Sequence, residues 1–327
     1  TALLLPRRMV LATALLATGL ATSLAVRAQQ PAAAQACAAP TGEVTMPSGV
    51  EPFRLKALDE ARLLKVYVDV LRFGDTAQDK SPFPPEMAAR SEFSKAGMTR
   101  LLADTILGAR RFEVFDMRSS VTAEQTDLVI DAQVLEATQT WKPIEGGRKR
   151  AQVRITLSLQ LKNVYTGQNL FPAAVKVDGV TGRGSGDGAV IALGEDENSP
   201  AVQRQVAGDY TNALRRAFSE ASLRIATVAR PMAKVLLVEG CDVALFGGSR
   251  FGLQARDELV IFRARMARMG DKEVLAQTRP VAQVRCASTG TDNAQCTLTS
   301  MVKGYQPQAD DYAVVTDQSM RNPRQEH

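Results

Sequence analysis

Apolar and polar residues alternate with two different periods between residues 63 and 228. A period of two marks strands, and it is clearest in residues 151–161, where every second residue from Val153 to Leu161 is apolar. Four further strands are expected over residues 63–73, 112–115, 127–138 and 170–180. A period near 3.6 predicts helices over residues 86–110 and 203–228. Two helices separated by a run of hairpin-linked strands predict an α+β fold, in which a sheet carries helices on one face.

Only short strands are expected after Pro231, separated by turn-rich pieces such as FGGSRFG and GTDNAQ. The six predicted strands are residues 233–239, 242–246, 258–265, 274–285, 295–301 and 312–316. This spacing predicts a small all-β barrel or sandwich. The chain is therefore divided into an α+β domain, residues 53–229, and a β domain, residues 230–317. The polar tail, residues 318–327, is expected to be disordered.

The N-terminal residues have the pattern of an export signal. Arg7 and Arg8 precede the uncharged run 9–26, and Val26 and Ala28 place small residues at the −3 and −1 positions of a cleavage site. The alternative is a membrane anchor, but the run is only 18 residues long and rich in Ala and Thr. We therefore predict a cleaved signal peptide over residues 1–28 and a periplasmic protein. Residues 29–52, rich in Ala, Pro and Gly, are expected to form a flexible arm.

Composition removes several classes of function. The chain has 327 residues and a net charge of +5, which falls to +2 when the three arginines of the signal peptide are removed. The charge argument for a nucleic-acid partner then mostly disappears. The only histidine is His327, the last residue, and no Cys-x-x-Cys pair occurs, so His-based catalysis and zinc binding are not expected. No acidic pair has the spacing of a catalytic dyad, and we expect neither enzymatic activity nor a cofactor or metal.

Export changes the meaning of the four cysteines, because disulfides form in oxidising compartments. Cys286 and Cys296 flank a polar hairpin turn and are the first expected pair, which leaves Cys37 to pair with Cys241. Four cysteines allow three connectivities, so this choice stays open. An alternative makes Cys37 a lipidated residue, because Gln35-Ala36-Cys37 faintly resembles the end of a lipobox. Position 34 is Ala rather than Leu, and the apolar run ends about ten residues earlier.

Four segments could bind a ligand or partner, and each has a plainer interpretation. The basic run 146–150 could bind anionic lipid, glycan or nucleic acid, or form a solvated hairpin tip. The glycine-rich run 182–188 could cradle a phosphate, but the next helix is some 15 residues away, which favours a loop or subunit contact. Three consecutive carboxylates at 195–197 cannot converge on calcium. Trp141 could anchor a partner or cover a sheet edge. The candidate interface residues are Trp141, Arg148, Lys149, Arg150, Arg183 and Ser185.

Several ordered segments resemble a known family. The series RRFEVFD, DLVIDAQVLEAT, VRITLSLQLKNVYTGQNLFPA and VDGVTGRGSG, followed by an amphipathic helix, resembles the curli-secretion-channel (CsgG) family and its relatives with the TolB N-terminal-type fold. The block LFGGSRFGLQARDELVIFR resembles the last domain of the flagellar H-ring protein, in which such a turn and strand open an SH3-like barrel. Arg256 replaces the Gly expected before Asp257. The resemblance covers about 260 residues by pattern.

The resemblance implies one of two functions. Channel-forming members donate two transmembrane hairpins, whose strands each need about 9–11 residues of alternating pattern. Residues 139–150 are too few and too charged for such a hairpin, and residues 181–202 alternate poorly. The resemblance therefore favours a periplasmic ring-forming scaffold of a bacterial envelope machine, either the flagellar outer ring or a secretion apparatus. Its partners would be further copies of the chain, flagellar or secretion ring components, and peptidoglycan or the outer membrane. The alternative is an outer-membrane-associated CsgG-like lipoprotein that acts through Cys37 in secretion of extracellular polymer or fibre subunits.

Overall fold

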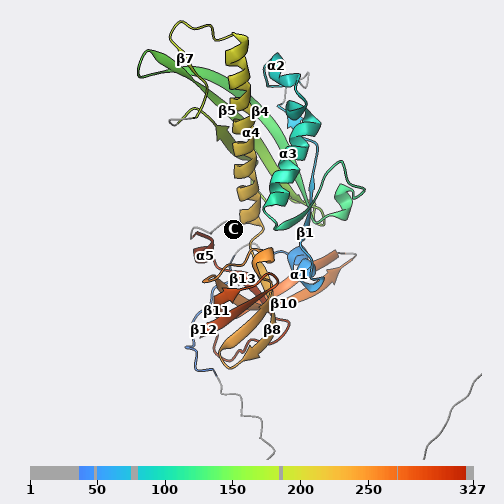
Figure 1. Ribbon diagram of the computed structural model, residues 1–327. Coiled ribbons are helices and arrows are strands. Elements are labelled where there is room, and N and C mark those ends of the chain that lie inside the picture. The colour runs from blue at the N-terminus through green and yellow to red at the C-terminus, as the bar shows by residue number, and fades with distance from the viewer. Residues whose placement is uncertain (1–36, 48–49, 75–79, 184–186, 271, 322–327) are drawn as a thin grey trace, which may run out of the picture. The chain divides into compact units, whose positions relative to one another are not determined.

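The computed structural model describes residues 37–47, 50–74, 80–183, 187–270 and 272–321 (Figure 1). The predicted signal peptide, the first part of the predicted arm, Ser185 and the last residues of the tail lie outside these ranges.

The first domain is built on a seven-stranded mixed sheet. Its strands are β1 (Leu64–Val68), β2 (Arg72–Phe73), β3 (Phe112–Phe115), β4 (Leu128–Ile144), β5 (Arg148–Asn163), β6 (Val175–Val180) and β7 (Val190–Ala192). The order is β3-β1-β4-β5-β6, with β2 beside β4 and β7 beside β5. Strands β3, β1 and β4 run parallel, whereas β4, β5 and β6 are antiparallel neighbours.

The hairpin formed by β4 and β5 is longer than predicted. Residues 139–150 were expected to link the two strands, but residues 139–144 continue β4 and pair with residues 148–153 of β5. Strand β7 pairs with residues 148–150 from the other side. Backbone pairing on both sides of β5 therefore extends the sheet through a segment whose polar side chains show no alternation.

Helices cover one face of this sheet. They are α2 (Pro85–Ala88), η1 (Ser91–Phe93), α3 (Lys95–Gly108) and α4 (Pro200–Val228), and α3 and α4 lie on the same face (Figure 1). The odd-numbered residues 151–161 of β5 are buried in one hydrophobic core with these helices, whereas the even-numbered residues are polar and more exposed. The sheet with helices on one face is thus the α+β arrangement that the periodicity predicted.

The single helix predicted over residues 86–110 is wrong in its first part. Ser94 has an extended backbone, and its Oγ accepts a hydrogen bond from the Gly97 N–H at 3.0 Å. This N-cap starts α3 at Lys95 and separates it from η1 and α2. The α4 helix begins in the same way, with Ser199 as its N-cap.

The second domain is a closed barrel with strand order β10-β11-β12-β9-β8-β13. The bounds are β8 (Met232–Glu239), β9 (Asp242–Phe246), β10 (Glu258–Met269), β11 (Lys272–Thr289), β12 (Asn293–Met301) and β13 (Tyr312–Val315), with η3 (Ser249–Phe251) between β9 and β10. All six predicted strands are present, and the sheet closes on itself instead of forming a sandwich.

The arm predicted to be flexible is ordered over residues 37–47. The Gly42 N–H donates to the Met301 carbonyl at 3.0 Å, and Val44 is only 6% exposed. After this segment comes α1 (Pro52–Asp59), whose Leu55 and Leu58 share a hydrophobic cluster with barrel residues. The prediction of a flexible arm is therefore wrong for these residues, because contacts with the distant β12 order them.

The predicted disorder of the tail is wrong at its start. Residues Asp317–Arg321 form helix α5. Ser319 is buried, and its Oγ accepts a hydrogen bond from the Glu258 N–H at 2.8 Å. This contact with the first residue of β10 was not visible in the polar composition of the tail.

Both disulfides have the pairing expected from the sequence. Cys286 and Cys296 are opposite each other in the register of β11 and β12. Cys37 is bonded to Cys241, at a sequence separation of 204. Since the Sγ atom of Cys37 is bonded to another sulfur, it has no valence for the thioether of a lipid anchor. The structure therefore contradicts the lipidated form of Cys37.

Candidate functional site

The end of the β4–β5 hairpin brings together most of the predicted interface residues. Trp141 of β4 is paired with Ala151 of β5, and Lys149 Nζ lies 5.7 Å from the centroid of the Trp141 ring. Lys149 also forms an ion pair with Glu197, which precedes α4. Trp141 is half-buried, so the indole is covered in part by this lysine and is not a freely projecting anchor.

The glycine-rich loop after β6 lies against the same hairpin. Gly182 and Gly188 have φ angles of +77° and +93°, and a Cβ on either would lie 2.1 Å and 2.5 Å from the carbonyl oxygen of Ala151. Only glycine permits both this backbone conformation and this close approach. A Cβ on Gly188 would also lie 3.3 Å from the Cγ atom of Arg150, and Arg183, which follows Gly182, is exposed. We call the set Trp141, Arg148, Lys149, Arg150 and Arg183 the tip surface.

The described residues of this loop, 182–183 and 187–188, are arranged around a carboxylate of the protein itself. The Gly182 N–H donates to Asp187 Oδ2 at 3.1 Å, and Arg216 of α4 forms an ion pair with the same carboxylate at 2.8 Å. The backbone amide of Gly182 and the guanidinium of Arg216 therefore both bind this internal carboxylate. The interpretation as a loop, which the sequence favoured, fits this arrangement.

A second carboxylate, which the sequence analysis missed, fixes the end of the loop. Asp209 of α4 is buried, and its Oδ2 accepts a hydrogen bond from the Ala189 N–H at 2.7 Å. Burial raises the pKa of Asp209 above its ordinary value, the hydrogen bond opposes this shift, and the nearby Asp187 adds to it. An acidic residue beside the apolar stripe of α4 is the signal that could have identified this position.

Strand β3 forms one edge of the seven-stranded sheet, and the surface beside it was not identified from the sequence. Among the described strands, β3 pairs only with β1, so its other side is open. Leu107 and Met117 beside it are 52% and 54% exposed. A groove of about 210 Å³ runs between α3 and β3, and it is lined in part by Leu107, Val114 and Arg118. We call this strand with Leu107 and Met117 the β3 edge.

An ion-pair network holds the rim of this groove. Asp116 is buried, and Arg118 Nε donates to it at 2.8 Å. This hydrogen bond keeps the pKa of Asp116 below its ordinary value. Arg118 also contacts Asp104 of α3 at 3.0 Å, so the segment after β3 is tied to the helix.

The carboxylate of Asp127, immediately before β4, holds neighbouring segments of the sheet domain together. Asp127, 1% exposed, accepts hydrogen bonds from Arg62 at 2.6 Å and 3.1 Å, from the Lys65 N–H at 2.8 Å and from the Tyr165 hydroxyl at 3.2 Å. Its acceptor sites are occupied by protein groups that join β1, β4 and the turn after β5.

Within the described ranges, no group of three or more His, Cys, Asp and Glu side chains is placed to hold a metal ion. No helix in that part of the chain is both long enough and apolar enough to cross a membrane.

No family model matches this chain, and no curated protein matches it. Similar solved structures include protein XCC0632 from Xanthomonas campestris, which is 11% identical over 58% of this chain and 94% of that chain, with a TM-score of 0.33. A minor lipoprotein from Acinetobacter baumannii is 12% identical over 50% of this chain and 90% of that chain, with a TM-score of 0.25. The PelC dodecamer from Paraburkholderia phytofirmans is 14% identical over 48% of this chain and 87% of that chain, with a TM-score of 0.24.

Proposed function

We propose that this protein is a noncatalytic, exported scaffold subunit that forms a ring within a bacterial envelope machine. The flagellar outer ring and a secretion apparatus are the machines to which the sequence resemblance points. The sheet domain then corresponds to the CsgG-like domain of that resemblance, and the barrel to its SH3-like domain.

The observation that carries this proposal is the open β3 edge. An unpaired strand edge beside exposed apolar side chains favours association with another chain. In the described sheet β3 lies at one end of the strand order and β6 at the other. A contact between these two different ends is heterologous, and such contacts repeat from copy to copy until the rotation closes a ring.

The cysteines support the location of this assembly. Two disulfides consume all four cysteines, and disulfides persist in oxidising compartments such as the periplasm. The predicted signal peptide points to the same compartment. The lipoprotein alternative is not retained, because Cys37 forms a disulfide.

In this proposal the barrel binds another component of the envelope machine. Leu236 and Leu237 of β8 and Met266 and Met269 of β10 are exposed apolar side chains. Because these residues belong to the barrel and not to the seven-stranded sheet, mutations can affect partner binding and self-association separately.

The test is the assembly state of the exported protein, measured by light scattering and negative-stain imaging without detergent. We expect the wild type to form rings and the variant Leu107→Lys/Met117→Lys to remain monomeric with an unchanged circular dichroism spectrum. Met269→Lys, a matched exposed apolar-to-lysine change on the barrel, should still assemble. A monomeric wild type at micromolar concentration would overturn the ring, and unchanged assembly of the double variant would overturn the role of the β3 edge.

A further inference from the structure

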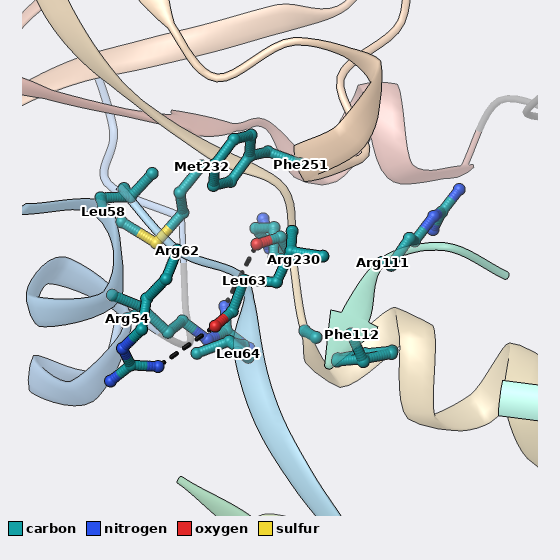
Figure 2. A pocket seen from close by; sticks show the side chains of 12 residues that line it. Arg54, Leu58, Arg62, Leu63, Leu64, Arg111, Phe112, Arg230, Met232 and Phe251 are labelled. Carbon is teal, nitrogen blue, oxygen red and sulfur yellow. Dashed lines mark hydrogen bonds between the residues drawn. The ribbon is translucent and has the colours of Figure 1, made fainter. Parts of the chain in front are cut away.

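A small cavity lies where α1, β1 and β3 meet the segment that links α4 to β8 (Figure 2). Its volume is about 50 Å³. Apolar side chains such as Leu58 and Phe112 line part of its wall. Four arginines line the rest: Arg54, Arg62, Arg111 and Arg230. This concentration of guanidinium groups is unusual for a buried site, because a cation without a counter-charge is costly to bury.

Arg54 is the exceptional member of this set. Its side chain belongs to α1 and the residue is only 4% exposed. No described residue accepts a hydrogen bond from its Nε, and its one hydrogen bond, from Nη1 to the Arg230 carbonyl, is 3.5 Å long. Burial lowers the pKa of Arg54 to about 10, with Glu51 acting in the opposite direction, so the side chain is still charged at neutral pH.

Two of the other arginines have their own counter-charges. Arg62 is paired with Asp127 and Glu60. Arg230 donates to the Val315 carbonyl at 3.0 Å and forms an ion pair with Asp317.

Arg111 is half-buried, and Figure 2 shows its side chain directed away from that of Arg54. Arg54 is therefore the fully buried arginine of this cavity, and among the described residues it has no ion pair, only the longer-range attraction of Glu51. A buried charge of this kind needs an anion, because arginine does not shed its proton at neutral pH.

We propose that this cavity binds a small oxyanion, a phosphate or carboxylate group, through the guanidinium of Arg54. One water needs about 10–15 Å³ of such volume, so a cavity of about 50 Å³ has room for an anion of three or four oxygens. The planar guanidinium donates two parallel hydrogen bonds to an oxyanion, and Nε is one of the donors left for this purpose. The anion would connect α1 to the segment that leads into β8.

The test compares oxyanions with chloride at equal ionic strength on the full-length mature protein. Inorganic phosphate and acetate are the two probes, and the readouts are the midpoint of thermal unfolding and calorimetric affinity. We expect phosphate, acetate or both to raise the midpoint in a saturable manner, whereas chloride does not. A response to phosphate alone would assign the site to phosphate groups, and a response to acetate alone would assign it to carboxylates. No response to either would overturn the proposal.

Three variants assign the response to Arg54. Arg54→Met should fold in oxyanion-free buffer, since an apolar side chain of similar length replaces a buried unpaired charge, and its affinity for the anion should fall at least about 30-fold. Arg54→Lys keeps the positive charge but lacks the planar guanidinium group, so this variant should bind the oxyanion more weakly than the wild type. Arg215→Met, a control on the exposed side of α4, should respond like the wild type.

An equal response in the wild type and both Arg54 variants would overturn the proposal. A loss of thermal stability in Arg54→Met with an unchanged anion response would do so as well, because it would assign Arg54 a purely structural role. Neither readout depends on ring formation, so this test and the assembly test can fail separately.

Discussion

The contact between Gly179 and α4 gives a prediction whose size can be worked from the structure. Gly179 lies in β6, on the side of the strand that faces α4. A Cβ at this position would lie 1.8 Å from the Ala213 carbonyl oxygen and 2.5 Å from the Ala217 nitrogen. Both atoms belong to the helix backbone, so no side-chain rotation can relieve the clash in Gly179→Ala.

The cost follows from the displacement that the methyl group demands. Ordinary contacts begin near 3.4 Å, so a contact of 1.8 Å requires α4 to move by about 1.5 Å. Ala213 and Ala217 are fully buried against the sheet and would lose close contacts. Overpacking typically costs about 1–3 kcal/mol, and we expect about 3 kcal/mol because a helix of 29 residues must shift as a unit.

Urea unfolding followed by tryptophan fluorescence measures this cost, because the only tryptophan, Trp141, lies in the same sheet. The matched control is Gly208→Ala in α4, where a Cβ would meet nothing within 4 Å. This control should raise the free energy of unfolding by about 0.5–1 kcal/mol, because alanine is the better helix former. If Gly179→Ala changes the free energy of unfolding by less than about 0.5 kcal/mol, the close packing of α4 on β6 is refuted.

Two further predictions concern the disulfides and the buried carboxylate. Serine replacement of the Cys37–Cys241 pair should lower the free energy of unfolding by about 5 kcal/mol, and replacement of the Cys286–Cys296 pair by about 3 kcal/mol. The difference arises because the two disulfides close loops with sequence separations of 204 and 10. Calorimetry without reductant compares them, and equal losses would contradict the loop-length argument. Asp209→Asn should stabilise the protein at pH 7, since burial raises the pKa of the carboxyl and ionisation opposes folding above that pKa. The extra stability of Asp209→Asn over the wild type should decrease as the pH falls from the raised pKa of Asp209 to its ordinary value of 3.8. Thermal unfolding of both proteins measures this, and a stability difference that does not change with pH would contradict it.

Local periodicity was sufficient to predict a strand or helix wherever the side chains of that element alone determine which of its faces is buried. The alternation in residues 151–161 predicted β5, because every second side chain enters the core beneath α4. The six strands of the barrel were predicted for the same reason, although β10 and β11 extend beyond their predicted ranges, 258–265 and 274–285. The hairpin turn between Cys286 and Cys296 predicted their pairing, since opposite positions of a hairpin bring two sulfurs together.

Elements stabilised by distant backbone partners were missed. Residues 139–144 became strand because β5 pairs with them, and β7, some 40 residues further along, pairs with the other side of β5. Residues 37–47 became ordered because Gly42 bonds to Met301. The break at Ser94 was also missed, because the apolar spacing continues across the N-cap.

The sequence by itself therefore determined the class of fold, the pattern of its two domains and the pairing of Cys286 with Cys296, which depend on neighbours in the chain. Only the tertiary structure decided which edge of the sheet stays open and which charge is buried. Arg54 and the Arg230 carbonyl that it contacts are 176 residues apart, and no local pattern distinguishes this arginine from an exposed one. Burial of a charge and exposure of a strand edge are properties of the packed chain, because both depend on what other segments place beside them.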